Sequence, residues 1–466
     1  MGLKKALKFI EVQKEIITNQ KKLIENQNKQ ISNLNAIRKS LEELVESLKK
    51  RVEELEAKSD KKELPPFVKE NIKTRKKKKG QKKGHEGYSR KTPERIDREE
   101  YHELDECPEC GGTNLSDVQE ETERVITDIQ EPQEAKNTKH RKQRKYCRDC
   151  KKIVEAPVAD ALPNARYGLR LMLFVMFLKI GMRLPVEKVC ELLDNMYKLK
   201  VSGGEIIHIM KQLAREFGPY YKELKIKIRE AKVRYIDETG RRVDGKNHMI
   251  WGFITEEVVL YKIHKSRGHK VPKKILGKNC KGVNVNDRYS AYYALNDELE
   301  NCEMQICWSH ILDDSKQLAK DFPEGKIIHR RLKRIFNSSK QFEGGKGTKK
   351  DVKKLLNRID RIRKLKFKST TCYKFIKNLS TRDRDHLFVF VTHSGVEPTS
   401  NRIERGLRHD VIIRKISGGN RSQKGARVHE CLLSTMMTYK LQRKDIMKDG
   451  LNYIQSNLMN KLQTIK

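Results

Sequence analysis

Val233-Arg-Tyr-Ile-Asp-Glu-Thr-Gly240 sets the architecture expected for this 466-residue chain. Its β-branched and aromatic residues predict a buried strand that delivers Asp237 and stops at Thr239-Gly240. The same pattern recurs at Gly282-Val-Asn-Val-Asn-Asp-Arg-Tyr289, which places Asp287 directly after a second short strand. A carboxylate at the end of a strand, open to solvent beside a turn, can bind a metal ion.

The segment between these two strands predicts how they pair. Met249–Thr255 and Val258–His264 have the composition of a hairpin, and a helix is expected over Val271–Leu276. Strand, hairpin, helix and strand in this order fit a ribonuclease-H-like α/β core, in which the first and fourth strands are neighbours. We therefore expect Asp237 and Asp287 to lie close together.

The composition indicates a polyanionic partner. Lys and Arg number 102 against 63 Asp and Glu, which gives a formal charge of +39. Such a surplus is typical of proteins that bind DNA or RNA, because the charge would repel itself without a counterpart. The length predicts two or more domains.

No hydrophobic run reaches the length of a membrane span. The longest, Leu171–Leu178, has eight residues and suits a buried helix. The N-terminal Met1-Gly-Leu-Lys-Lys-Ala6 lacks the apolar core of a secretory signal, so the protein is expected to stay where it is made, with no membrane partner. Ten cysteines in such a chain argue against a disulfide scaffold.

The first part of the chain has a heptad repeat. The a positions are Ile or Val, apart from Arg38: Ile10, Ile17, Ile24, Ile31, Val45 and Val52. The d positions are Gln in the first half and Leu in the second: Gln13, Gln20, Gln27, Leu34, Leu41, Leu48 and Leu55. β-branched residues at a with Leu at d favour a parallel two-stranded coiled coil, so we expect a homodimer or higher oligomer. The alternative is a long amphipathic helix folded back onto its own domain.

A basic linker should follow the coiled coil. Residues 69–91 carry eleven Lys or Arg against two acids. Such a segment cannot bury enough apolar surface to fold alone. Its cationic run could lie along phosphates without sequence preference, and a merely solubilising tether is an equal alternative. The run consists of Arg75, Lys76, Lys77, Lys78 and Lys79.

Two Cys-X-X-Cys pairs separated by 36 residues predict a structural zinc site. The ligands would be Cys107, Cys110, Cys147 and Cys150. Four thiolates complete a tetrahedral zinc shell and leave no open position for catalysis. Val125–Ile129 and the basic His140–Lys145 are expected to supply strands of a zinc ribbon. A redox pair is the competing interpretation, but it needs only one of the two motifs.

The segment before the first strand predicts helices. Leu169–Ile180 is mostly apolar, and Val186–Asn195 and Ser202–Phe217 have helical spacing. Ser202 and Glu205 form a capping box for the last of them. The last two helices could form a helix-turn-helix whose second helix enters a major groove, and a plain packing unit explains the pattern equally well.

A strand-like Met304–Trp308 leads into a helix expected over His310–Phe322. Cys307 and His310 have a metal-like spacing, but no second pair accompanies them. A core cysteine and a structural or DNA-facing histidine are therefore favoured. Residues 326–390 are rich in Lys and Arg with apolar residues at helical spacing, which predicts a helical insertion within the core.

A third carboxylate candidate lies in Val396-Glu-Pro-Thr-Ser-Asn-Arg-Ile-Glu-Arg-Gly-Leu-Arg408. Asn401, Glu404 and Arg408 share one helical face, whereas Ile403 and Leu407 face away. Asn401 and Glu404 also have the spacing of a capping box. The spacing is equally consistent with two roles for Glu404, a helix cap and a site residue.

The residues around this helix suit contacts to DNA. Arg414, Lys415 and Arg421 lie near Gly418-Gly419, where backbone amides and guanidinium groups could bind phosphates. Arg405 and Arg408, on the helix itself, are expected to join them.

Three blocks of sequence resemble the catalytic region of the insertion-sequence-66 family of bacterial and archaeal transposases. They are Asp237–Gly240 with Val243–Trp251, Asp287–Tyr292 with Cys307–His310, and Glu397–Arg405 with Arg414–Ser422. The resemblance extends along nearly the whole chain. It implies that Asp237, Asp287 and Glu404 form the family's DDE triad. One departure is Ser400 before Asn401, where the family often has a second Asn.

The resemblance implies a DNA transposase of the prokaryotic cytoplasm, associated with the nucleoid. Two Mg²⁺ or Mn²⁺ ions would activate a water or a 3′-hydroxyl and stabilise the departing oxygen. Asp237 would bridge both ions, and Asp287 and Glu404 would each bind one. The enzyme would nick element ends and join the 3′-hydroxyls to target DNA, with accessory proteins of the same element as further partners. The alternatives are a noncatalytic zinc-dependent DNA-binding regulator and a ribonuclease-H-like structure-specific nuclease.

The expected fold is therefore multidomain α+β. Its parts are a coiled coil (1–58), a basic linker (59–100), a zinc ribbon (101–160), a helical region with a candidate helix-turn-helix (161–230), the first part of a ribonuclease-H-like core (231–325), a helical insertion (326–395), the last part of the core with the third acid (396–445) and a C-terminal tail (446–466).

Overall fold

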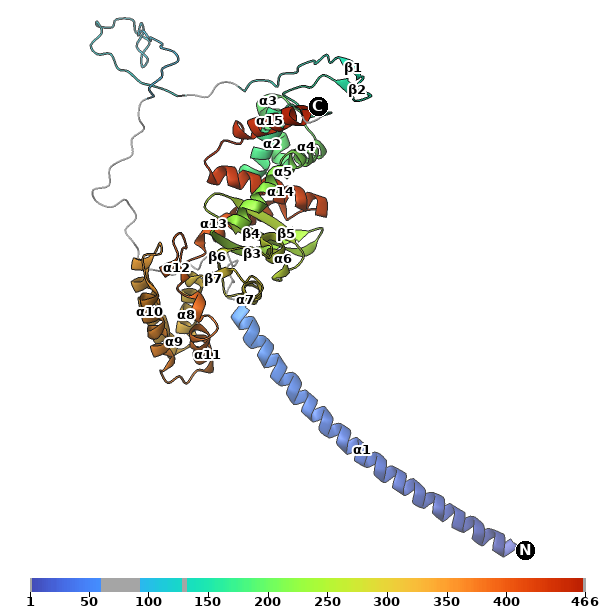
Figure 1. Ribbon diagram of the computed structural model, residues 1–466. Coiled ribbons are helices and arrows are strands. Elements are labelled where there is room, and N and C mark those ends of the chain that lie inside the picture. Colours follow the sequence, from blue (N-terminus) through green and yellow to red (C-terminus); the bar gives the residue numbers. More distant parts are fainter. Residues whose placement is uncertain (1, 60–92, 128–131, 464–466) are drawn as a thin grey trace. The chain divides into compact units, whose positions relative to one another are not determined.

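The computed structural model describes residues 2–59, 93–127 and 132–463 (Figure 1). The chain divides into two compact units, Met1–Thr127 and Asp128–Lys466, and each is described by itself. The basic run Arg75–Lys79 lies outside the described residues. None of the described helices combines the length and the hydropathy that crossing a bilayer requires.

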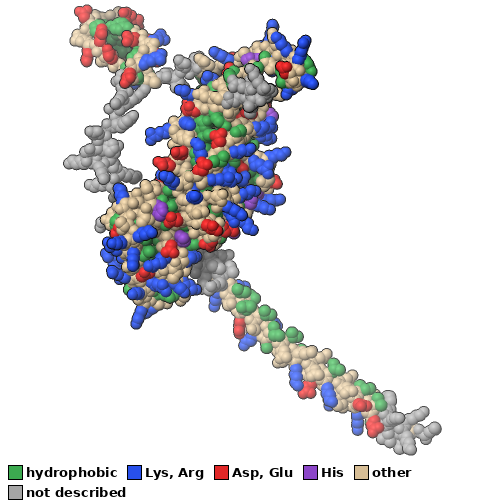
Figure 2. Space-filling model, in the orientation of Figure 1, with side chains coloured by type: hydrophobic (Ala, Val, Ile, Leu, Met, Phe, Trp, Pro, Cys, Tyr) green, Lys and Arg blue, Asp and Glu red, His purple; other side chains and the backbone are tan. Residues whose placement is uncertain are grey.

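Helix α1 runs from Gly2 to Ser59 without interruption, as the heptad pattern predicts. Its described a and d residues of apolar type are all at least 50% exposed: Ile10, Ile17, Ile24, Ile31, Leu34, Leu41, Val45 and Leu48. Figure 2 shows hydrophobic side chains along one edge of this helix and charged side chains along the other. A helix with an uncovered apolar stripe gains stability by packing against a partner. The two-stranded coiled coil stays a prediction.

In the second unit, a short antiparallel hairpin carries the second cysteine pair. It consists of β1 (Arg144–Cys147) and β2 (Lys152–Glu155). The strand expected over His140–Lys145 begins only at Arg144, because the hairpin closes through the turn that follows Cys147. In the first unit, Val125–Thr127 have no regular secondary structure, and the remainder of that expected strand lies outside the described residues.

The second unit contains a five-stranded sheet of order β5-β4-β3-β6-β7. The strands are β3 (Val233–Val243), β4 (Lys246–Ile254), β5 (Val259–His264), β6 (Gly282–Asn286) and β7 (Cys302–Ile306). β3, β4 and β5 pair antiparallel, whereas β6 runs parallel to β3 and β7 runs parallel to β6. The first and fourth strands of the sheet are therefore neighbours, as predicted.

The expectation that the first strand stops at Gly240 is wrong. β3 continues to Val243 because β4 pairs with it along its whole second half, and the hairpin turns only at Asp244-Gly245. Both turn residues have positive φ, 53° and 68°. The parallel pairing with β6, in contrast, ends at Tyr235. On this side β3 has no strand partner beyond Tyr235 until Val243 forms an isolated parallel bridge with Asn420, and Asp237 lies in the unpaired stretch.

Helices from both ends of the second unit lie side by side (Figure 1). Those before the sheet are α2 (Leu169–Met176), the π-helix η1 (Phe177–Gly181), α3 (Val186–Tyr197), α4 (Gly203–Glu216) and α5 (Gly218–Glu230). Those after it are α14 (Gln423–Leu441) and α15 (Asp449–Gln463). Phe217 stacks on Tyr453 with ring centroids 5.5 Å apart. The segment expected to be a C-terminal tail is therefore largely a packed helix.

The capping box predicted for α4 is present. Ser202 Oγ accepts a hydrogen bond from the Glu205 backbone N–H, and the Glu205 carboxylate accepts one from the Ser202 backbone N–H. Ile206, Ile209 and Leu213 are buried, and α4 packs against α2 and α14. The α3–α4 pair thus serves as a packing unit, and its use as a helix-turn-helix stays a prediction.

Helix α14 covers the outer edge of β5 with polar side chains. The backbone N–H groups of Val259, Tyr261 and Ile263 donate to Thr438 Oγ1, Ser434 Oγ and Glu430 Oε2 at 3.0, 2.8 and 2.8 Å. Two residues of a strand advance about 6.6 Å, and four residues of a helix advance about 6 Å. The two spacings match closely enough for one helix to satisfy three successive edge groups. An open strand edge, which invites pairing with other chains, is thereby closed.

The Ser434→Ala substitution is expected to destabilise the second unit by about 1–3 kcal/mol, because the buried Tyr261 N–H loses its acceptor. Urea unfolding of the full chain measures this change. Ser380→Ala is the matched control, since the Ser380 hydroxyl is also buried but donates only to Lys377 O of its own helix. Equal costs for the two variants would contradict the role assigned to Ser434.

The remaining elements complete the second unit. They are α6 (Lys270–Leu276), α7 (Ser290–Asp297), α8 (Trp308–Asp321), α9 (Pro323–Ser339), η2 (Lys340–Phe342), α10 (Lys349–Arg363), α11 (Thr370–Ser380), η3 (Arg384–His386), α12 (Val389–Thr392) and α13 (Asn401–Ser417). Residues 326–390, expected to be a helical insertion, are mostly helical. Lys and Arg are spread over its visible face in Figure 2.

Aromatic packing joins the helices of this insertion to the start of α8. Trp308, the first residue of α8, stacks on Phe336 of α9 with ring centroids 5.3 Å apart. Its indole Nε1–H donates to Leu387 O at 2.6 Å. Arg288, next to Asp287, forms an ion pair with the buried Asp383 at 2.9 Å. The insertion is therefore anchored beside the second candidate acid.

Candidate catalytic site

Asp237 and Asp287 each lie two residues beyond the last parallel pair of β3 and β6, Tyr235 with Val285. Val233 pairs with Val283 and Tyr235 with Val285, a constant offset of 50 (283 − 233). The same offset takes Asp237 to Asp287. Asp287 directly follows β6, and neighbouring strands lie about 4.8 Å apart. Its carboxylate accepts a hydrogen bond from the Tyr289 backbone N–H at 2.8 Å, which orients it in the turn before α7.

The environment of Asp237 reflects this proximity. Burial raises the pKa of Asp237 to about 7; the neighbouring carboxylates of Glu238 and Asp287 add to the rise, and the Glu238 backbone N–H and the His310 imidazole oppose it. Like charges held close together disfavour the ionised form of each. A divalent cation among these carboxylates would relieve that repulsion.

Helix α13 brings Glu404 to the same face of the sheet. Asp237 pairs directly with Gly252 of β4, so the Cα atoms of both residues point their substituents to one face. A Cβ on Gly252 would lie 2.7 Å from Ile403 Cδ1 and 3.1 Å from Leu407 Cδ2. The missing side chain therefore lets α13 approach the sheet beside Asp237. Ile403 and Leu407 are buried in this contact, as predicted.

Glu404 does not act as a helix cap. The N-cap residue of α13 is Ser400 and not Asn401, so Glu404 stands one position beyond the place of a capping-box acid. Its carboxylate accepts a hydrogen bond from the Ser400 hydroxyl at 3.2 Å. The side chain is 40% exposed, which leaves carboxylate oxygen free for a ligand. The departure from the family pattern at Ser400 thus supplies a partner for the acid.

The imidazole of His310 lies among the three candidate acids. Its Nε2 is 3.9 Å from Glu404 Oε1. Interaction with Cys307 raises the pKa of His310 to about 9, burial opposes the rise, and Glu404 and Asp287 contribute to it. Sequence reasoning favoured a structural or DNA-facing role for this residue. In the sequence, only the Cys-X-X-His spacing at a strand–helix junction pointed to this site. Glu404, the carboxylate near His310, comes from a helix remote in sequence.

Cys307 is buried, as predicted, and lies next to His310. Its Sγ accepts a hydrogen bond from the Ser400 backbone N–H at 3.1 Å. Burial raises the pKa of the Cys307 thiol, but the nearby His310 imidazole and the hydrogen bond from Ser400 bring it below its usual value. One ligand atom from each of Cys307, His310 and Glu404 lies within 4.8 Å of the others.

Glu238, beside Asp237, is a structural carboxylate that sequence reasoning missed. It is 8% exposed and points to the opposite face of β3. Arg267 Nε donates to it at 2.8 Å and the Tyr292 hydroxyl forms a short hydrogen bond to it. Burial raises the pKa of Glu238, and the bonds from Tyr292 and Arg267 oppose this. Its oxygens are used by these partners, so it is unsuited to hold a metal ion.

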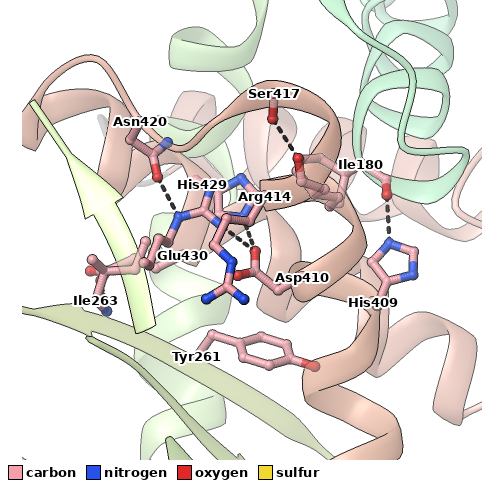
Figure 3. Close-up of polar contacts among 12 residues, drawn as sticks. Ile180, Tyr261, Ile263, His409, Asp410, Arg414, Ser417, Asn420, His429 and Glu430 are labelled. Carbon is pink, nitrogen blue, oxygen red and sulfur yellow. Dashed lines mark hydrogen bonds and ion pairs between the residues drawn. The ribbon is translucent and has the colours of Figure 1, made fainter. Parts of the chain in front are cut away.

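A buried polar network fastens α13 to β3 (Figure 3). Asp410 Oδ1 accepts hydrogen bonds from Arg241 at 2.5 Å and from His429 Nε2 at 2.7 Å. Arg241 Nε also donates to Asn420 Oδ1 at 2.6 Å. Since Arg241 is on the strand of Asp237 and Asp410 is on the helix of Glu404, this network fixes the two acid-bearing elements to each other.

The basic residues predicted to contact DNA differ in their exposure and in their contacts within the chain. Arg405, Arg408 and Arg421 are exposed. Arg414 is half-buried, and its guanidinium donates a short hydrogen bond to the Gly240 carbonyl of β3. Lys415 is exposed and has an interaction within the chain.

The glycines beside these basic residues are required by the backbone. Gly418 ends α13 in the left-handed conformation. Gly419 has a φ of 120°, and a Cβ there would lie 2.4 Å from Arg242 O. The Gly418-Gly419 pair therefore serves the packing of the loop on β3.

The four cysteines predicted to bind zinc are free thiols. Cys107 and Cys110 belong to the first unit, where the Gly111 N–H donates to Cys107 O at 2.8 Å in a tight turn. Cys147 and Cys150 belong to the second, where the Cys150 N–H donates to Cys147 Sγ at 3.4 Å. Backbone N–H donation lowers the pKa of both Cys107 and Cys147, which favours the thiolate that binds a metal.

Family models match two parts of the sequence. One, described as "Transposase IS66 family", matches residues 164–428, and the other, described as "zinc-finger binding domain of transposase IS66", matches residues 105–151. The first contains Asp237, Asp287 and Glu404, and the second contains all four cysteines of the two pairs. No curated protein matches the chain.

Three solved structures show a weak similarity. The catalytic domain of Mos1 mariner transposase is 15% identical over 40% of this chain and 95% of that chain, with a TM-score of 0.14. The Mos1 transposase catalytic domain with Raltegravir and Mn is 16% identical over 40% of this chain and 96% of that chain, with a TM-score of 0.13. The Mos1 strand transfer complex is 14% identical over 48% of this chain and 77% of that chain, with a TM-score of 0.14. Scores this low add nothing to the structural comparison.

Proposed function

Because this chain belongs to the IS66 family of transposases, whose family model covers residues 164–428, we propose that it cuts the ends of an insertion sequence and joins them to target DNA. The observation that supports the proposal is that the His310 imidazole interacts electrostatically with Asp237, Asp287 and Glu404, and its Nε2 lies 3.9 Å from Glu404 Oε1. Asp237 and Asp287 each follow the last parallel pair of β3 and β6 by two residues, and Gly252 lets α13 pack against β4.

Asp237, Asp287 and Glu404 would hold two Mg²⁺ or Mn²⁺ ions. The donor set fits, since these ions prefer carboxylate oxygens. Burial, with added repulsion from Glu238 and Asp287, raises the pKa of Asp237, and a cation beside it would stabilise its ionised form. Two such ions supply Lewis-acid stabilisation of the attacking and departing oxygens of a phosphodiester. The protein contributes the rigid placement of the acids on β3, at the end of β6 and on α13.

The surrounding residues would position DNA in this site. Exposed Arg405 and Arg408 lie on the helix of Glu404, one and four residues beyond it, and would neutralise phosphates next to the scissile bond. The basic helical insertion adds a sequence-independent attraction. The zinc ribbon, the basic linker and the α3–α4 pair would bind the element ends, and α1 would pair two copies so that both ends are held together.

Incubation of the full chain with DNA that carries the element ends tests this proposal. We expect nicks at the ends and joined strand-transfer products in Mg²⁺ or Mn²⁺, and neither in EDTA or with scrambled ends. Binding without cleavage would favour a noncatalytic regulator. Cleavage of branched DNA or RNA–DNA hybrids without joining would favour a structure-specific nuclease.

The zinc ribbon yields a separate prediction. Cys110→Ser and Cys147→Ser are each expected to abolish chelator-resistant zinc, because a structural site requires all four thiolates. Elemental analysis of the purified full chain after dialysis against EDTA measures the bound metal. Cys190→Ser, which changes a half-buried cysteine of α3, is the matched control. A Cys147→Ser variant that keeps its full zinc content would refute the ligand set.

A further inference from the structure

Beside the carboxylate site lie a thiol and an imidazole, and hard cations such as Mg²⁺ have no need of such ligands. Cys307 directly precedes α8, His310 lies in the first turn of that helix, and Glu404 lies in the first turn of α13. Their sulfur, nitrogen and oxygen donors lie within 4.8 Å of one another. The three residues come from two helices whose N-terminal ends meet beside the sheet.

We propose that Cys307, His310 and Glu404 bind a borderline-soft divalent cation of the Zn²⁺ class, at a site that overlaps the catalytic site through Glu404. The consequence for activity rests on the proposed function. A cation held there withdraws Glu404 from the carboxylate set, so Zn²⁺ is an inhibitor of this enzyme. The site is distinct from the ribbon, which uses four other cysteines.

The chemistry of the donors selects the cation. Thiolate and imidazole ligands suit Zn²⁺ and Co²⁺, whereas Mg²⁺ takes oxygen ligands in an octahedral shell. Three protein ligands leave a fourth tetrahedral position for water or a phosphate oxygen. A site of this composition therefore takes Zn²⁺ even when Mg²⁺ is in large excess.

The surrounding hydrogen bonds hold the donors in place before any cation arrives. The Cys307 N–H donates to Asn286 O at 2.8 Å, and the Trp308 N–H donates to Pro398 O at 2.9 Å. Ser400, whose N–H donates to Cys307 Sγ, also donates its hydroxyl to Glu404. The loop before α13 is thus fastened to the start of α8, and Ser400 holds both the Cys307 sulfur and the Glu404 carboxylate.

One donor is also left without a partner. The Nδ1 atom of His310 is buried and has no hydrogen bond to any group in the part of the chain that the structure describes. A buried polar atom without a partner is costly. A cation bound through Nδ1 would satisfy it.

Cobalt spectroscopy on the full chain, with its ribbon zinc in place, tests the site without reference to activity. Addition of Co²⁺ to the wild type is expected to give a sulfur-to-cobalt charge-transfer band and the visible bands of tetrahedral cobalt, saturating at one equivalent. Cys307→Ser should lose the charge-transfer band and bind Zn²⁺ at least about tenfold more weakly. Cys431→Ser, a buried cysteine of α14 whose thiol donates to Ala214 O, is the control and should keep both.

The same spectra can overturn the proposal. A wild-type chain without the sulfur band, or a band of equal intensity in Cys307→Ser, rejects the site. Glu404→Gln provides a second variant at a partly exposed position, and it should keep the sulfur band while its Zn²⁺ affinity falls. Unchanged affinity in that variant would also reject the site.

An activity measurement then separates the two proposals. Zn²⁺ is expected to inhibit Mg²⁺-dependent nicking by the wild type, with Cys307→Ser at least about tenfold less sensitive. Equal sensitivity of the two proteins rejects the inhibitory role. A chain that nicks no DNA contradicts the proposed function, and the cobalt spectra still decide the metal site.

Discussion

The Asp237→Asn variant is expected to lose Mg²⁺-dependent nicking of element ends by at least about a thousandfold, the scale found when a group acting on the reacting centre is removed. Asn keeps the shape of the side chain but removes the negative charge that a cation requires. Binding of end DNA should stay within about twofold, because exposed arginines and the zinc ribbon carry that interaction. Nicking assays and gel-shift titrations on the same DNA measure both. Retained strand transfer would reject Asp237 as a metal ligand.

The same substitution should stabilise the metal-free protein at neutral and alkaline pH. The folded state raises the pKa of Asp237 to about 7 from an ordinary 3.8, so between these values it binds a proton that the unfolded state has released. Stability of the wild type therefore falls as pH rises through this range and then levels off. The rise in pKa corresponds to at most about 4 kcal/mol, and solvent screening at this half-buried position lowers the expected gain to about 1–2 kcal/mol.

Urea unfolding in EDTA at pH 8 and at pH 4 measures this gain. The free energy of unfolding of the variant should exceed that of the wild type at pH 8. The difference should shrink towards pH 4, where Asp237 is protonated in the folded state. Asp244→Asn, in the turn of the same hairpin, is the control: Asp244 is exposed with a φ of 53°, which Asn tolerates. A destabilised Asp237→Asn variant would show that the charge at this position is structural.

The predictions of where the three acids lie required different kinds of information. Asp237 and Asp287 could be placed together from sequence, because strand composition is local and parallel neighbours share a register. Glu404 could not, since its helical face and a capping box have the same spacing. Two other residues decide its position: Gly252, remote in the chain, lets α13 approach the sheet, and Ser400, four residues before Glu404, takes the N-cap.

Long-range polar contacts explain most of what sequence reasoning missed. The strand end at Gly240 was misplaced because a glycine in isolation signals a break, whereas β4 supplies pairing as far as Val243. The coverage of the β5 edge by α14 depends on polar residues four apart, a pattern that a surface helix also has. Glu404 beside His310 and Arg241 beside Asp410 likewise come from elements remote in sequence, and periodicity within one segment carries no information about them.

Loss of the Asp410 carboxylate is expected to be the most damaging change to stability, about 3–5 kcal/mol for Asp410→Ala. Asp410 and Arg241 have side chains 1% exposed, so the substitution leaves a guanidinium charge buried with only the Asn420 carbonyl and no anion. His429 cannot supply the lost negative charge, because an imidazole is either neutral or cationic. Urea unfolding of the full chain at pH 7 measures the loss, and exposed Arg408→Ala on the same helix should change stability by less than about 0.5 kcal/mol.

A paired substitution separates the unpaired charge from lost packing. Arg241→Met with Asp410→Leu removes both charges while keeping volume, and it should recover most of the stability that Asp410→Ala loses. The pH dependence gives an independent check. Although burial raises the pKa of Asp410, His429 and Arg241 bring it below the ordinary value, so its stabilising contribution is complete above pH 3.8 and disappears as the folded carboxyl is protonated at lower pH. If the double variant is as unstable as Asp410→Ala, packing and not charge fastens the helix of Glu404 to the strand of Asp237.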